Sequence, residues 1–194
     1  MGICFLAYSL SPHNLASVGA SPALVWRVLE SDDEAAYLRQ LAKDGKTSLL
    51  QRLLGKTKAV APPQSLSFSD AELKMLDLDK SWDGLRHCIR LCAPDSPDFF
   101  EGDGQIGSIE VGYGPALFAE GPTIARYARS LEGITDDALL ATLRTADFSG
   151  VYLDGLWKRQ DEDAESYLLE NFHDLRAFIA HCASHGQAAL LQFI

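Results

Sequence analysis

The sequence has few basic residues for its length, and this shortage limits what the protein can bind. It carries 17 Lys and Arg residues against 27 Asp and Glu residues, for a formal net charge of −10 and a pI of about 4.8. A surface that holds a phosphate backbone needs clustered Lys and Arg. The composition therefore predicts no nucleic-acid partner, and it is compatible with a basic protein as partner.

Long apolar segments and a disulfide pattern are also missing. No apolar run approaches the length that spans a bilayer. The apolar residues 2–10 have no basic residue before them and no clear small-residue cleavage site, so they indicate a strand and not a signal peptide. The spacing of Cys4, Cys88, Cys92 and Cys182 favours free thiols in a reducing compartment. We therefore expect no membrane association and a cytoplasmic location.

Short catalytic motifs are absent as well. The sequence contains no G-x-S-x-G elbow, P-loop, H-E-x-x-H or kinase signature. Residues 102–107 match the letters of the dinucleotide pattern G-x-G-x-x-G, but that mechanism needs a strand before the glycines and a helix after them. Here the residues that follow look extended, so a flexible loop is the better interpretation. No cofactor is predicted.

What is present is ordinary material for a folded core, with 47% hydrophobic and 23% charged residues. The length fits a single domain over residues 1–194. Residues 2–10 and 188–194 are the most hydrophobic strand candidates, so we expect them to pair in the centre of one small sheet. Because helical patterns dominate elsewhere, the predicted fold class is α+β: a compact, helix-rich domain whose small central sheet includes both terminal strands.

Helix signals are clearest in the second half of the chain. Cap residues and apolar spacing predict helices over residues 121–132, 136–145 and 162–185. Residues 32–54 are also helical in character, with a break at Asp44-Gly45. Residues 95–112 are rich in Gly, Asp, Ser and Pro, so they are predicted to be mostly loop, with a short strand near the end.

The stretch from residue 76 to residue 92 has the densest group of candidate functional residues. Asp77 or Asp79 can cap a helix there. The apolar stripe of that helix has steps of four and three and consists of Leu78, Trp82, Leu85, Ile89 and Cys92.

The candidate catalytic residues of this stretch are Asp79, Lys80, Asp83 and His87. Asp79 and Asp83 are four residues apart, so on a helix they share a face beside Lys80, and paired carboxylates can perform acid–base chemistry. Helix caps and solvated charges explain the same residues without any catalysis. The sequence leaves both interpretations open.

Two further groups of residues could bind a ligand. Tyr113, Pro115 and Trp157 could line a cleft beside the candidate catalytic residues. His181 and His185 are four residues apart on a predicted helix, as a metal pair can be, but a metal site needs more ligands than two. Histidines that interact with the dipole at a helix end are the simpler interpretation, so no metal is predicted.

The stretch Leu76 to Leu85 resembles the YfbM-like family of small bacterial proteins, a domain of unknown function, and the likeness extends over most of the chain. The resemblance implies a single α+β domain and brings no established reaction, cofactor or catalytic residue. Leu117 occupies a place associated with a basic residue in that family. The other segments that carry the likeness are Met1 to Phe5, Tyr113 to Ala116, Val151-Tyr152 with Trp157, the helix around Tyr167 to Phe178, and the closing apolar strand.

Two hypotheses of different class follow. The first is a non-catalytic interaction protein, such as an inhibitor or immunity-type partner of a basic protein, and it depends on the acidic charge and the missing catalytic motifs. The alternative is an enzyme that acts on a small polar substrate through Asp79, Lys80, Asp83 and His87. The sequence makes no prediction of oligomeric state.

Overall fold

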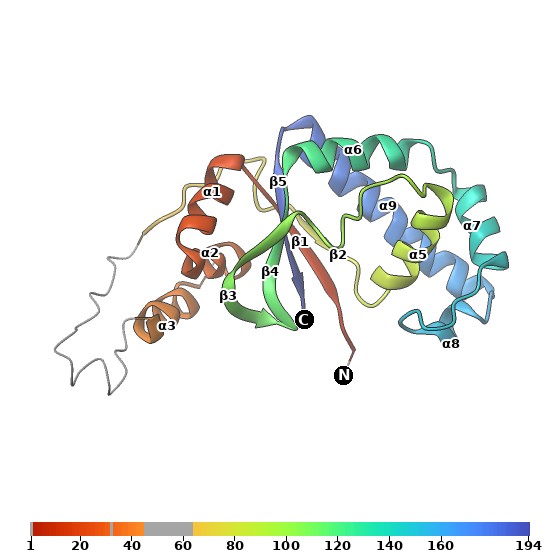
Figure 1. Ribbon diagram of the computed structural model, residues 1–194, viewed down its shortest axis with the longest axis horizontal. Coiled ribbons are helices and arrows are strands. Elements are labelled where there is room, and N and C mark those ends of the chain that lie inside the picture. Colours follow the sequence, from red (N-terminus) through yellow and green to blue (C-terminus); the bar gives the residue numbers. More distant parts are fainter. Residues whose placement is uncertain (1, 32, 45–63) are drawn as a thin grey trace.

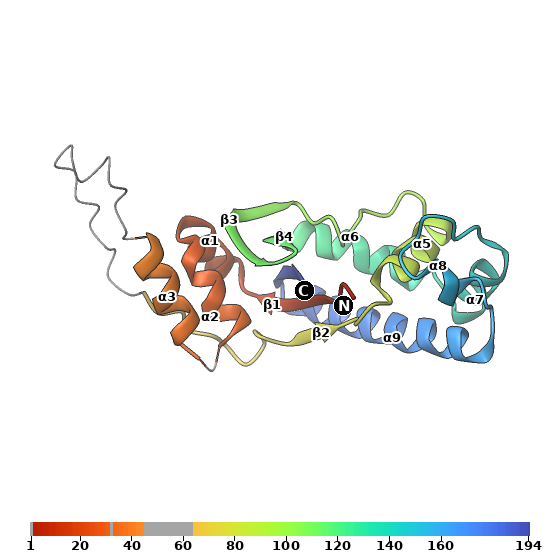
Figure 2. The same cartoon turned by 90° about the horizontal axis from the view of Figure 1, so that it is seen from below.

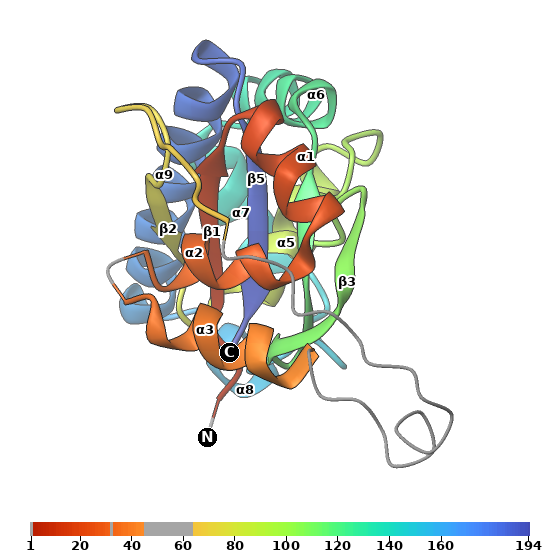
Figure 3. The same ribbon diagram turned by 90° about the vertical axis from the view of Figure 1, so that its left-hand side faces the viewer.

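A computed structural model describes residues 2–31, 33–44 and 64–194, and its centre is a five-stranded antiparallel sheet with the order β2-β1-β5-β4-β3 (Figure 1). Figure 3 shows the sheet from one end, with β2 at one edge and β3 at the other. The strands are β1 (Phe5–Leu10), β2 (Met75–Asp77), β3 (Gly104–Gly112), β4 (Gly114–Ala119) and β5 (Ala188–Phe193).

The two terminal strands lie side by side in the middle of this sheet. β1 pairs with β5 in an antiparallel register that runs from Phe5 opposite Phe193 to Leu10 opposite Ala188. Both strands are nearly free of charged residues because helices cover both of their faces. The predicted central pair and the α+β fold class are confirmed.

The larger helical layer covers one face of the sheet and extends past its end (Figures 1 and 2). Phe5 and Ala7 of β1 and Leu191 of β5 point into this layer and are completely buried. The predicted helices are confirmed within a residue, since Thr135 and Gly121-Pro122 start two of them as expected. The helices are α5 (Trp82–Cys92), α6 (Gly121–Glu132), α7 (Asp136–Thr145), α8 (Asp154–Trp157) and α9 (Glu162–Ser184).

A smaller helical layer covers the other face. Leu10 and Leu190 point into it, between the first helices and the β3–β4 hairpin. Its elements are α1 (Pro12–Ala20), the 3-10 turn η1 (Pro22–Leu24), α2 (Val25–Leu29) and α3 (Ala35–Asp44). α3 confirms the first part of the predicted helical stretch, and the part of that prediction from residue 45 to residue 54 lies outside the described residues.

The prediction that residues 95–112 are mostly loop is partly wrong. The second half of this segment forms β3, whose first residue, Gly104, lies opposite Phe118 of β4. The G-x-G-x-x-G letters therefore enter an edge strand, and a register shift between Gln105 and Glu110 makes that strand irregular. Glycine and polar residues gave it a loop-like sequence, while the hydrogen-bonding partner β4 and the contact with η1 make it a strand.

The start of α5 also differs from the prediction. Neither Asp77 nor Asp79 caps the helix, because the N-cap position is Ser81, whose hydroxyl donates instead to the carbonyl of Leu78 at 2.7 Å. Asp77 accepts a hydrogen bond from the backbone N–H of Asp79 at 2.8 Å. The apolar stripe is as expected, with Leu85 completely buried and Ile89 almost so. Among the described residues, no helix is both long and apolar enough to span a bilayer.

Candidate functional site

Asp79 lies in the short connection between β2 and α5 and joins three distant parts of the chain. One carboxylate oxygen accepts from the Cys4 thiol of the N-terminal segment at 3.2 Å, and the other accepts from the Tyr167 hydroxyl of α9 at 2.9 Å. Its backbone has a left-handed conformation with φ of 44°, which aspartate tolerates better than most residues. The carboxylate therefore holds the N-terminal segment and α9 to the start of α5.

The contacts between Asp79, Cys4 and Tyr167 also set the protonation states of these three side chains. Burial raises the pKa of Asp79, but hydrogen bonds from Cys4 and Tyr167 outweigh that effect, so the pKa is below its usual value. Burial and the neighbouring carboxylate raise the pKa of both Cys4 and Tyr167. At neutral pH the group is a carboxylate with two neutral donors, and Cys4 is a poor nucleophile because it stays a thiol.

Lys80 lies beside this group but has a packing role of its own. Its aliphatic stem is half-buried against Gly2, where a Cβ would collide with the stem and with the Tyr152 hydroxyl. Tyr152 in turn accepts from the backbone N–H of Ile3 at 2.9 Å. Lys80 thus packs against the start of the chain and does not point toward Asp83 or His87 in a shared hollow.

Asp83 and His87 lie on a different side of α5, at a hollow of about 460 Å³. Asp83 accepts from the backbone N–H of Tyr152 at 2.8 Å, so it holds the segment before α8 against the helix. The His87 ring packs on Phe148 with centroids 5.1 Å apart. Within the described part of the chain, His87 Nε2 is buried without a hydrogen-bond partner. The other residues that line the hollow are Arg86, Arg90, Leu91, Ser149, Gly150 and Val151.

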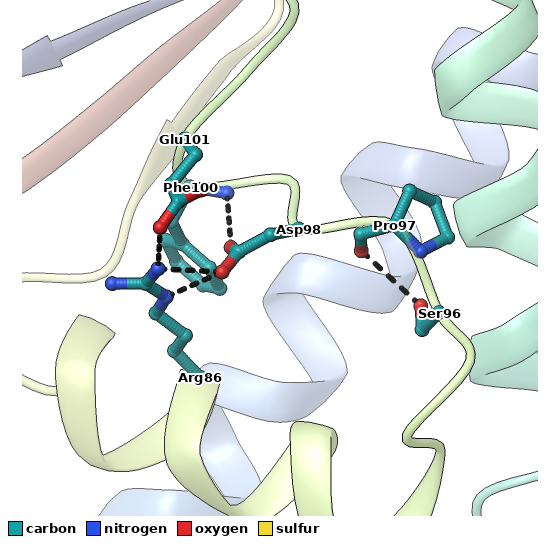
Figure 4. A network of polar contacts seen from close by, with 6 residues as sticks. All are labelled: Arg86, Ser96, Pro97, Asp98, Phe100 and Glu101. Atoms are coloured by element: carbon teal, nitrogen blue, oxygen red, sulfur yellow. Dashed lines mark hydrogen bonds and ion pairs between the residues drawn. The ribbon is translucent and has the colours of Figure 1, made fainter.

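Arg86 makes the main polar contacts of α5, and sequence reasoning missed it (Figure 4). Its guanidinium donates from Nε and Nη2 to Asp98 Oδ2 at 2.7 and 2.6 Å, and it also pairs with Glu101. Asp98 accepts the Phe100 N–H at 3.1 Å through its second oxygen. This pairing holds the segment that places Phe99 and Phe100 in the core. The only sequence signal for this ion pair was an arginine on a predicted helix that is followed by a loop rich in acidic residues.

The predicted binding residues do not form one cleft. Trp157 is 0% exposed, packs on Gly84 and donates from Nε1 to the carbonyl of Tyr152 at 2.9 Å, so the prediction that it lines a cleft is wrong. Tyr113 is 56% exposed at the turn between β3 and β4, and Pro115 lies in β4 opposite Glu110. Trp157 is buried because it packs against Gly84 of α5, a contact that the local sequence does not indicate.

The two candidate metal ligands are close together but already engaged. The rings of His181 and His185 have centroids 4.4 Å apart. His181 Nε2 lies 2.8 Å from the carbonyl of Ala71, and His185 Nδ1 lies 2.9 Å from the carbonyl of His181. No group of three or more His, Cys, Asp or Glu residues in the described ranges could hold a metal ion.

The comparisons with known proteins place the chain in a family without an assigned activity. Residues 1–192 match the family described as Domain of unknown function (DUF1877), so the chain belongs to that family. A solved structure, that of the protein of unknown function YfbM from Escherichia coli, is similar with a TM-score of 0.49 and 13% identity, over 98% of this chain and 99% of that one. No curated protein matches the sequence. The family match confirms the expected domain of unknown function over almost the whole chain.

Proposed function

We propose that this member of the family is a non-catalytic interaction protein of the bacterial cytoplasm that binds a basic protein, as an inhibitor or immunity-type partner does. The observation that carries the proposal is an acidic stripe on α9, made of Asp163, Glu170 and Asp174. Their spacing puts the three side chains on one helix face, and all three are exposed. No ion pair is recorded for them among the described residues, whereas the neighbouring acids Asp161 and Glu165 each pair with an arginine.

The charge of the surrounding surface has the same sign. Residues 136–174 hold ten of the 27 acidic residues and three of the 17 basic ones. These residues form α7, α8 and the first half of α9, which meet at the end of the molecule farthest from α3 (Figure 2). A concentrated negative field of this kind accelerates the approach of a positively charged partner and fixes its orientation.

The alternative, an enzyme acting on a small polar substrate, has less support. Asp79 and Asp83 use their carboxylates to hold the N-terminal segment and the segment before α8. Burial raises the pKa of the Cys88 and Cys182 thiols to about 12, so neither is a ready nucleophile. The four free cysteines are compatible with the reducing cytoplasm.

The test is affinity capture from an extract of the source organism at low and moderate salt with three immobilised proteins. These are the unchanged protein, the stripe variant D163K/E170K/D174K, and the control variant D70K/D95K/E132K. The control residues are also exposed and their substitution changes the net charge by the same amount, but none of them belongs to α9 or to the acidic stripe.

We expect the unchanged protein and the control variant to retain one basic protein in stoichiometric amount, and the stripe variant to lose it. Retention should weaken as salt rises, because exposed charges are screened beyond about 10 Å at 0.1 M ionic strength. Equal retention by both variants, or no stoichiometric basic protein at either salt concentration, would contradict the proposal.

A further inference from the structure

A cavity in the described part of the chain lies on the opposite side of the sheet from the predicted catalytic residues. It has a volume of about 570 Å³, which is within the usual range of small-molecule sites. α1 and the β3–β4 hairpin form its sides, and the beginnings of α6 and β5 close one end. Figure 1 shows α1 beside the β3–β4 hairpin. Leu15, Ile106 and Phe118 supply apolar surface.

Glycines leave much of this wall without side chains. Gly19 of α1 and Gly186 before β5 both line the cavity, and a Cβ built on either would meet no atom within 4 Å. The protein therefore does not fill the space at these positions. An apolar cavity whose wall is partly formed by glycine backbone can accept a compact apolar group without any rearrangement of the core.

Only one of the described lining residues is ionisable, and it is acidic. Glu120 lies at the N-cap of α6, and no side-chain partner is recorded for its carboxylate. The positive end of the α6 dipole is already matched, because Asp103 accepts from the N–H of Glu120 at 2.7 Å and from the Thr123 hydroxyl at 2.8 Å. An anionic ligand in the cavity would thus meet the Glu120 carboxylate and no free helix dipole, whereas a cation would meet a complementary charge.

We propose that this cavity binds a small amphiphilic cation, whose apolar body lies between α1 and the hairpin and whose protonated amine pairs with Glu120. The site is separate from the acidic stripe on α9, so it can be occupied while a partner protein is bound. Three probes with one phenyl body and different head groups test it: phenethylamine, 2-phenylethanol and 3-phenylpropionate. Binding is followed through the backbone amide signals of Gly19, Gly107 and Gly121.

We expect phenethylamine to shift these signals and to bind about two- to fivefold more tightly than 2-phenylethanol, which is the gain in affinity that one solvent-exposed ion pair gives. We expect 3-phenylpropionate to bind most weakly. Glu120→Gln should make the amine and the alcohol bind equally. Gly19→Phe should weaken all three probes at least tenfold. Gly155→Phe is the matched control, because Gly155 also has open space around it but lies in α8, outside the cavity.

Three results would overturn the proposal. One is that none of the probes shifts the three amide signals at a probe concentration of about 10 mM, because a site that binds more weakly than this is of no use as a ligand site. Another is that the carboxylate binds most tightly. The third is that Glu120→Gln leaves the preference for the amine unchanged while the amide spectrum shows a folded protein, a result that does not depend on whether Gly19→Phe folds.

Discussion

The two sides of the sheet are built in opposite ways. On the α5–α9 side, glycine serves close packing, since Gly84 of α5 lies directly on the Trp157 ring, and the charged side chains hold loops in place. On the α1 side, Gly19 borders open space and a cavity remains. The comparison teaches that Asp79, Asp83 and Arg86 on the α5–α9 side make contacts within the protein, whereas the cavity on the α1 side is mainly apolar and bordered by an open glycine.

The same substitution on the two sides is the strongest test of that difference. Gly84→Ala should destabilise the protein by about 3 kcal/mol, because the new methyl group overlaps the Trp157 ring in a tightly packed core. Gly19→Ala should stabilise it by about 0.5 kcal/mol, since alanine favours the helix and meets nothing. Urea unfolding of both variants measures the two effects. Equal effects would mean that the two sides do not differ in packing.

The ion pairs of α5 provide the next test. Arg86→Gln should cost about 2 kcal/mol, because it leaves the half-buried Asp98 without its charged partner. Arg90→Gln, one turn further along the same helix and exposed, should change the unfolding free energy by less than about 0.5 kcal/mol. A loss that is the same for both arginines would show that Arg86 does not hold the loop that carries Phe99 and Phe100.

The stability of the α1 side depends on pH through the carboxyl group of Glu72. Burial raises the pKa of Glu72, but hydrogen bonds from Ser69, Ser11 and Asn14 outweigh that effect and lower the pKa from 4.5 to about 2. A lowered pKa in the folded state stabilises the protein above pH 4.5, and this stability is lost as the pH falls toward 2.

Glu72→Gln should therefore reduce the change in unfolding free energy over this pH range by about 1 kcal/mol, a modest value because the carboxylate is only partly buried and solvent screens it. Urea unfolding at several pH values measures it. Glu170→Gln removes a carboxylate from an exposed position of α9 and is the matched control. An unchanged slope for Glu72→Gln would mean that these hydrogen bonds do not stabilise the start of α1.

The smallest effect is expected at the Asp79 group. Tyr167→Phe removes one hydrogen bond to the carboxylate, so it should raise the pKa of Asp79 and cost about 0.5 kcal/mol. Titration of the Asp79 carboxyl signal by NMR measures the change in pKa. Tyr113→Phe removes an exposed hydroxyl and is the control. If the Asp79 pKa is the same in both variants, the Tyr167 hydroxyl is not its partner in solution.

The sequence predicted the parts of the fold that have a local signal. β1 and β5 are uncharged apolar segments, and the periodic apolar residues of α6, α7 and α9 each define a buried face. The strands β2 and β4 and the first part of β3 were missed because they are short or rich in glycine and polar residues. Such segments become strands only when a neighbouring strand satisfies their backbone hydrogen bonds.

For the candidate site, too, the sequence predicted the features that have a local signal and missed those that depend on distant segments. Sequence spacing indicated which residues of α5 were charged and which were buried, but not what they contacted. Asp79 contacts Cys4 and Tyr167, residues that are 75 and 88 positions away, and Trp157 is buried by the close approach of α5. The sequence by itself therefore determined α6, α7 and α9, the central strand pair and the acidic charge, which depend on neighbouring residues and composition. Only the tertiary structure decided which polar groups are engaged and where a cavity remains, because both depend on contacts between segments far apart in the chain.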